Sequence, residues 1–174
     1  MFKRKVLLFL TLSCLYSCEY YLSVDLRNDF KDCILVYVAL GNTPDCPTSY
    51  PDSLLPAEKY NLHKTGDKLS DYLIEIKPCS TKSLWSCMSY NDDTATCLRE
   101  SISSDTLSVF VIHTDTLSKY GYDRVAAENL IMTRYDFSIK DLQKLDYKIT
   151  FPPNPLMKNV KMYPSYESVI GKLE

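Results

Sequence analysis

The chain has 174 residues, with 20 lysines and arginines against 22 aspartates and glutamates, and its formal net charge is −2 at neutral pH. This acidic balance argues against nucleic acid or an anionic lipid surface as a partner. Four scattered glycines cannot build a phosphate-binding loop, whereas 14 tyrosines favour a packed, β-rich domain over a disordered stalk.

Residues 1–17 have the organisation of a secretory signal peptide. A basic start, Lys3-Arg4-Lys5, precedes the apolar run 6–16, and the small residue Ser17 follows it. The run has eleven residues, whereas a helix that crosses a bilayer needs roughly 20. The segment therefore predicts export followed by removal of residues 1–17.

The end of this segment, Leu15-Tyr16-Ser17-Cys18, resembles the lipobox of bacterial lipoproteins. The resemblance implies cleavage between Ser17 and Cys18, diacylglycerol on the Cys18 thiol and a further acyl chain, such as palmitate, on the new amino terminus. Several chains make a durable membrane anchor, whereas one chain binds only marginally. We therefore expect a cell-envelope protein at the outer membrane, on its periplasmic face or at the cell surface. The alternative is an ordinary signal peptide with an incidental cysteine.

The mature chain has 157 residues, enough for one domain with a real core. We expect a single domain over 18–157 and a C-terminal tail, 158–174, that can hold one more short strand. The removed segment carries three basic and no acidic residues, so the mature charge is 17 minus 22, or −5.

The first half predicts three strands. Residues 20–27 alternate apolar and polar side chains, and the apolar run 33–40 is typical of a strand buried on both faces; together they suggest a hairpin. The segment 41–70 contains four prolines and is expected to be a long surface excursion. A third strand over 71–77 ends at Pro78, and a cysteine-bearing loop follows as far as about Ser104.

The second half alternates strands with short helices. Strands are predicted over 107–113, 131–135 and 147–151, and helices over 115–120, over 123–129 and after the capping-box residue Ser138. Six strands and two or three short helices predict an α+β domain around a mainly antiparallel sheet. An immunoglobulin-like β-sandwich is the alternative.

Five cysteines remain beyond Cys18, so they cannot all pair with one another: Cys33, Cys46, Cys79, Cys87 and Cys97. Export to an oxidising compartment permits disulfides. Cys87 and Cys97 lie in a polar, turn-rich region and are the pair we expect to form a bridge. Cys33 opens an apolar run and is expected to be a buried thiol.

No residue pattern predicts catalysis, a metal site or a cofactor. His113 ends an apolar strand close to Asp115, which makes a membrane-anchored hydrolase the alternative function. The cysteine spacings match no zinc module, and Asn91-Asp92-Asp93 lacks the glycine and further oxygen ligands of a calcium loop. Several tyrosines are candidates for exposure, which suits a protein or glycan partner: Tyr20, Tyr21, Tyr50, Tyr60, Tyr90, Tyr163 and Tyr166.

The second half also carries a family resemblance. Its residues are Asp105 to Ile112, Asp115-Thr116-Leu117, Lys119-Tyr120-Gly121 and, most specifically, the block from Arg134 to Pro153. This pattern resembles an uncharacterised family of small envelope lipoproteins of Bacteroidota-type bacteria. The resemblance implies a compartment and a fold, not a chemistry.

Bacteria of that type glycosylate exported proteins at Asp-Ser/Thr followed by a small or aliphatic residue. Four positions match, where about one is expected by chance, and their acceptors would be Ser53, Thr94, Thr106 and Thr116. The alternative is that these dipeptides mark turns and helix caps. The sequence therefore favours a lipid-anchored, non-catalytic protein that binds a partner or serves as an accessory subunit.

Overall fold

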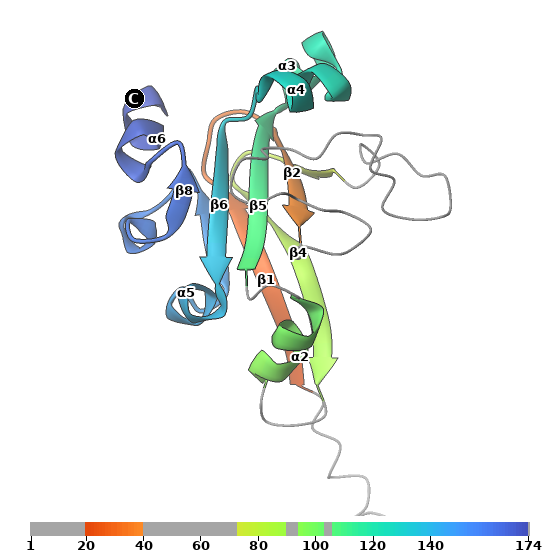
Figure 1. The fold of residues 1–174 in the computed structure, drawn as a ribbon, viewed down its shortest axis with the longest axis vertical. Helices are drawn as coiled ribbons and strands as arrows, with labels where there is room; N and C mark the ends of the chain where they lie inside the picture. Colours follow the sequence, from red (N-terminus) through yellow and green to blue (C-terminus); the bar gives the residue numbers. More distant parts are fainter. Residues whose placement is uncertain (1–19, 40–72, 90–93, 103–105, 174) are drawn as a thin grey trace, which may run out of the picture.

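The strand predicted over residues 20–27 forms. In the computed structural model, which describes residues 20–39, 73–89, 94–102 and 106–173, strand β1 spans Tyr20–Asn28 (Figure 1). Its alternate residues Leu22, Val24 and Leu26 are buried, because a strand turns successive side chains to opposite faces. The start of the fold thus lies next to Cys18 in the chain.

β1 is the central strand of a three-stranded sheet with the order β4-β1-β7. β4 (Ser80–Ser89) pairs with it antiparallel, and β7 (Lys148–Phe151) pairs with it parallel. The expectation of a loop over 79–104 was wrong in two places, since β4 and helix α2 (Thr94–Ser101) occupy much of it. The serines of β4 interrupt the apolar alternation from which a strand is predicted. The strand is stabilised by pairing with β1 and by inward packing of Leu84.

The second sheet has five antiparallel strands in the order β3-β2-β5-β6-β8. They are β2 (Ile34–Ala39), β3 (Ile74–Ile76), β5 (Thr106–His113), β6 (Thr133–Ser138) and β8 (Lys161–Tyr163). The segment expected to be a tail supplies β8, which pairs with β6, and helix α6 (Tyr166–Leu173).

The expected hairpin between the first two strands was wrong, because β1 and β2 belong to different sheets. The buried Asn28 side chain stabilises the connection by which the chain passes from the first sheet to the second. Its amide donates to the carbonyl oxygens of Asp32, at 2.9 Å, and Ile76, at 3.0 Å, and its oxygen accepts from the Phe30 N–H. Periodicity predicted both strands but could not tell pairing side by side from packing face to face.

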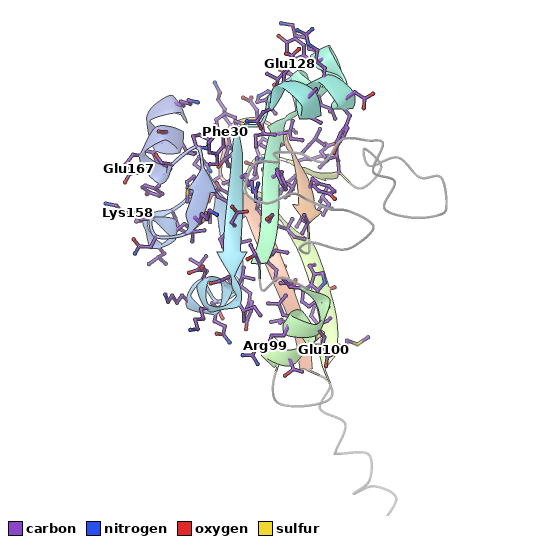
Figure 2. The ribbon with its side chains drawn as sticks, in the orientation of Figure 1. Phe30, Arg99, Glu100, Glu128, Lys158 and Glu167 are labelled. Carbon is purple, nitrogen blue, oxygen red and sulfur yellow. A yellow bond between two sulfur atoms is a disulfide. The ribbon has the colours of Figure 1, made fainter. Side chains whose placement is uncertain are left out.

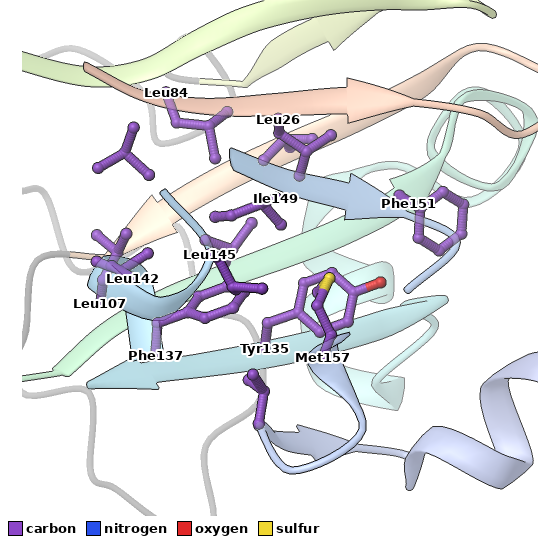
Figure 3. Packing of buried hydrophobic residues seen from close by; sticks show 14 of the residues in the cluster. Leu26, Leu84, Leu107, Tyr135, Phe137, Leu142, Leu145, Ile149, Phe151 and Met157 are labelled. Carbon is purple, nitrogen blue, oxygen red and sulfur yellow. The ribbon is translucent and has the colours of Figure 1, made fainter. Parts of the chain in front are cut away.

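The main core lies between the two sheets (Figure 3). One side contributes Leu26, Ile149 and Phe151, and the other contributes residues such as Tyr135 and Phe137. This face-to-face layering is shared with the sandwich alternative. The parallel β1–β7 pair and the short helices make the fold α+β, as predicted.

Helices close the ends and the outer face of the sheets. α3 (Thr114–Tyr120) and α4 (Tyr122–Glu128) follow β5, and Tyr122 and Val125 pack on a second apolar cluster with Phe110. α5 (Ile139–Lys144) has the expected capping box, in which Ser138 and Asp141 exchange hydrogen bonds. A 3-10 turn, η2 (Pro155–Met157), precedes β8. The described residues thus hold five α-helices, all of them after residue 93, more than the two or three expected.

Tyr135 is a polar exception inside the main core. Its hydroxyl is fully buried and has no hydrogen-bond partner among the described residues. Burial raises the pKa of this phenol well above its ordinary value near 10, because the phenolate cannot be solvated there. The unpartnered hydroxyl therefore lowers the stability of the fold at every pH, and more so in alkali.

We predict that Tyr135→Phe raises the free energy of unfolding by about 1 kcal/mol at neutral pH, because a buried unsatisfied hydroxyl is removed. In the unfolded chain Tyr135 ionises near pH 10, whereas in the fold it stays protonated to higher pH. The destabilisation by Tyr135 therefore grows as pH rises from about 10 towards the raised pKa, and Tyr135→Phe should reduce this growth. Urea unfolding between neutral and alkaline pH measures both effects; a destabilised Tyr135→Phe protein contradicts the assignment.

Candidate functional site

The most informative region is the end of the fold where β1 begins, close in sequence to Cys18. Tyr20, the first residue of β1, pairs with Ser89 at the end of β4, and α2 lies beside them (Figure 1). Ser17 and Cys18 lie outside the described residues, but Cys18 is only two residues before Tyr20. An extended chain spans at most about 3.6 Å per residue, so the Cα atoms of Cys18 and Tyr20 are within about 7 Å. We call this region, residues 20–22 with 87–89 and α2, the anchor end, because the sequence predicts lipid on the nearby Cys18.

A disulfide strengthens the anchor end. Cys87 of β4 and Cys97 of α2 form the bridge expected from the sequence, with an S–S distance of 2.06 Å and a Cα–Cα distance of 6.5 Å. Leu98 and Ile102 of the bridged segment are buried in the main core. Cys33, expected to be buried, is half-buried and its thiol is free, as is that of the exposed Cys79; Cys46 lies outside the described residues.

Two exposed apolar side chains lie side by side at the anchor end. Tyr21 of β1 and Met88 of β4 are directly opposite each other in the antiparallel pair, and they are 64% and 60% exposed. Of the other candidate tyrosines, Tyr163 is also exposed and Tyr166 is half-buried. The Tyr20 side chain and the entire residues Tyr50, Tyr60 and Tyr90 lie outside the described part of the chain.

His113 is held by hydrogen bonds at both ring nitrogens. Its Nδ1 accepts from the Asp115 backbone N–H at 3.1 Å, which makes His113, not Asp115, the N-cap of α3. Its Nε2 lies 3.4 Å from Asp32 Oδ2. A neutral imidazole that accepts at Nδ1 carries its proton at Nε2, so this Nε2–H donates to Asp32. Both ring nitrogens therefore make contacts within the fold.

The hydrolase alternative pairs His113 with the Asp115 carboxylate, and the two side chains lie close together. The Asp115 side chain is 92% exposed, and its Oδ2 lies 3.9 Å from His113 Nδ1, the nitrogen that caps the helix. A carboxylate that orients a catalytic histidine is buried and accepts from the Nδ1–H. The geometry instead describes a strand-end histidine that starts a helix.

A buried charged network lies on the outer face of the five-stranded sheet. Arg134 Nε donates to Asp136 Oδ1 at 2.8 Å, and Ser108 Oγ donates to the same oxygen at 2.8 Å. All three residues are buried, and the Arg134 guanidinium lies 5.3 Å from the centre of the Phe110 ring. Arg134 lies within the block that carries the family resemblance, but this network was not predicted from the sequence. Arg134 and Asp136 alternate with Tyr135 and Phe137, and this alternation was the sequence feature that could have predicted a polar network on one face of the strand.

The candidate glycosylation acceptors lie in different settings. Thr106 is half-buried and pairs with Ser138 at the start of β5, and Thr116 is half-buried within α3. Thr94 is the first residue of α2, but its side chain, like the whole of Ser53, lies outside the described part. Because Thr106 is paired in the sheet, it is a poorer glycan acceptor than Thr116.

A surface pocket of about 220 Å³ lies between α6 and the sheets. Its lining is Ile131, Met132, Phe151, Val169 and Lys172, which is apolar apart from the lysine. None of the proposed chemical residues, such as His113 or Asp115, lines it. The pocket offers an apolar surface without an acid and base pair to act on a substrate.

The described residues hold neither a metal-binding cluster nor a membrane-spanning helix. They contain no group of three or more histidine, cysteine or acidic side chains that could hold a metal ion. They contain no helix long and apolar enough to cross a membrane.

Comparisons with known proteins add no relative. The chain matches no protein-family model, no curated protein and no solved structure.

We predict that the double variant Cys87→Ser/Cys97→Ser lowers the free energy of unfolding by about 2 to 3 kcal/mol, because the bridge closes a loop of about ten residues and restricts the unfolded chain. Urea unfolding measures the loss, and non-reducing peptide mapping verifies the bridge in the parent. Cys79→Ser is the matched control at an exposed free thiol and should change stability little. Free thiols at both Cys87 and Cys97 in the mature protein would contradict the pairing.

We predict that Asp136→Ala lowers the free energy of unfolding by roughly 3 to 5 kcal/mol, because the Arg134 charge remains buried without its carboxylate. The chain offers a matched control in Arg27 and Asp29, which have the same two-residue spacing and a Nε–Oδ1 distance of 2.7 Å but are exposed. Asp29→Ala should cost less than about 1 kcal/mol. Equal losses in urea unfolding would show that burial does not set the strength of the Arg134 network.

Proposed function

We propose that the chain is an exported bacterial envelope lipoprotein, anchored by lipid on Cys18, that binds a partner or serves as an accessory subunit without catalysis. The observation that carries this proposal is the arrangement of residues 1–18. A basic start, an eleven-residue apolar run and Leu15-Tyr16-Ser17-Cys18 come directly before a strand that begins at Tyr20. The lipid would therefore be attached almost directly to the folded domain.

Two structural features support export and a binding role. The disulfide between Cys87 and Cys97 is compatible with an oxidising compartment outside the cytoplasm. The side chains most able to do chemistry are engaged in structural contacts, since His113 caps α3 and Arg134 is paired with Asp136. These contacts favour a role in recognition over the alternative hydrolase.

The partner is proposed to be a protein or a glycan of the envelope. A mature charge of −5 disfavours nucleic acid. The expected location is the outer membrane, on the periplasmic face or at the cell surface. Tyrosines, which offer both an apolar ring and a hydroxyl, are suited to either class of partner.

We predict that the protein isolated from membranes of its native host begins at a diacylglyceryl-modified Cys18. Mass spectrometry of the amino-terminal peptide tests this, because the acyl chains shift its mass and two or more chains keep it in the membrane fraction. Cys18→Ser should abolish the modification and leave the protein unprocessed or soluble. Cys14→Ser, within the apolar run, is the control and should leave lipidation at Cys18 intact.

An unmodified amino terminus in the soluble fraction would contradict the proposal and make this a free exported domain. The intact mass of the same sample also tests the glycosylation hypothesis. A mass equal to peptide plus lipid excludes glycans at Ser53, Thr94, Thr106 and Thr116.

A further inference from the structure

The exposed pair at the anchor end is unlike the rest of its sheet face. Along β1, the side chains that share the outward face with Tyr21 are Ser23, Asp25 and Arg27, because every second residue points the same way. On β4 the residue next to Met88 on that face is Ser86, which lies opposite Ser23. Apolar exposure on this face is therefore greatest at the Tyr21–Met88 pair, nearest Cys18, and gives way to hydroxyls and charges along the strands.

The position of this pair relative to the anchor is constrained. Tyr21 follows Cys18 by three residues, so the ring is attached within about 11 Å of the lipid-bearing Cα atom. Met88 is directly opposite Tyr21 in the strand pair, and the neighbouring Cys87 is fixed by its disulfide to α2. Both side chains are thus presented by a braced strand pair rather than by a loop.

The chemistry of the pair fits the interfacial layer of a bilayer. Tyrosine is enriched at membrane interfaces, where its ring meets acyl chains and its hydroxyl meets water. Methionine is apolar and flexible and adapts to an irregular apolar surface. The charges of α2 near this end are of opposite sign, Arg99 and Glu100 (Figure 2), so attraction to anionic lipid is not the driving force.

We propose that Tyr21 and Met88 lie in the interfacial layer of the membrane that holds the Cys18 lipid, as a second, non-covalent contact that orients the domain. This inference rests on the proposed lipidation of Cys18. The sheet would lean so that the outward face of the anchor end meets the bilayer, while Asp25 and Arg27 on the same face stay in water. Helices α3 and α4, at the opposite end of the fold, would then face the aqueous space and any partner (Figure 1).

Depth-dependent quenching tests the contact in the acylated, full-length mature protein. Trp85, the single tryptophan of the chain, is replaced by phenylalanine, and a new tryptophan is introduced by Met88→Trp. The matched control is Leu156→Trp in the same background, because Leu156 is 76% exposed and lies in η2, beside Lys158 and away from Arg99 (Figure 2). Each protein is reconstituted into phosphatidylcholine vesicles in which part of the lipid carries bromine near the carbonyl end of the acyl chains.

In the Met88→Trp protein, brominated lipid should remove about half or more of the tryptophan emission, because an interfacial side chain lies about 5 to 10 Å deep. The Leu156→Trp protein should lose little. Equal, weak quenching of the two proteins overturns the proposal. The proposal is also overturned if the Met88→Trp protein is not quenched and forms dimers on the vesicles. The Tyr21–Met88 pair would then be a contact between two copies of the chain.

Two further measurements keep the outcomes separate. The amino-terminal mass of each reconstituted sample establishes whether Cys18 is acylated, so failure of lipidation is distinguished from failure of the contact. Hydroxyl-radical labelling of the unsubstituted protein avoids any effect of the substitutions on folding. Oxidation of Tyr21 and Met88, relative to Tyr163, should be lower in the vesicle-bound acylated protein than in the soluble Cys18→Ser protein, and equal labelling overturns the proposal.

Discussion

The structure depends on the position of β1 at the centre of the smaller sheet. This strand pairs with β4 on one side and β7 on the other, so it joins the start of the chain to segments that follow it by about 60 and 120 residues. Its buried residues Leu22, Val24 and Leu26 then pack against the five-stranded sheet. β1 therefore contributes both to the hydrogen bonding of the smaller sheet and to the apolar core between the sheets, so both sheets depend on this strand.

Because β1 begins so close to Cys18, the proposed lipid anchor would restrict the orientation of the domain. A lipid attached through a long disordered linker would leave a domain free to adopt any orientation. Here Cys18 is two residues from a strand braced by its neighbours and by the Cys87–Cys97 bridge. An anchor placed there restricts how the whole domain can sit on a membrane, and the Tyr21–Met88 pair accounts for the side on which it would rest.

Two polar sites show how hydrogen bonds within the fold give reactive residue types a structural role. His113 and the Arg134–Asp136 pair contain the residue types found in active sites, but their hydrogen-bonding atoms have partners within the fold. The His113 ring links the end of β5 to the start of α3, and Arg134 with Asp136 secures the pairing of β5 and β6 through Ser108. Their contribution is to the register of the strands and to the boundaries of the elements.

The sequence by itself determined the local features of this protein: the organisation of residues 1–18, the alternation of β1, the continuous apolar run of β5 and the capping box at Ser138. Each depends on residues close together in the chain. Only the tertiary structure decided that β1 and β2 part into separate sheets, that the serine-rich β4 is a strand, and that Tyr21 lies opposite Met88. The physical reason is that strand pairing and burial join residues far apart in sequence, and neither periodicity nor propensity specifies which distant segment becomes the neighbour.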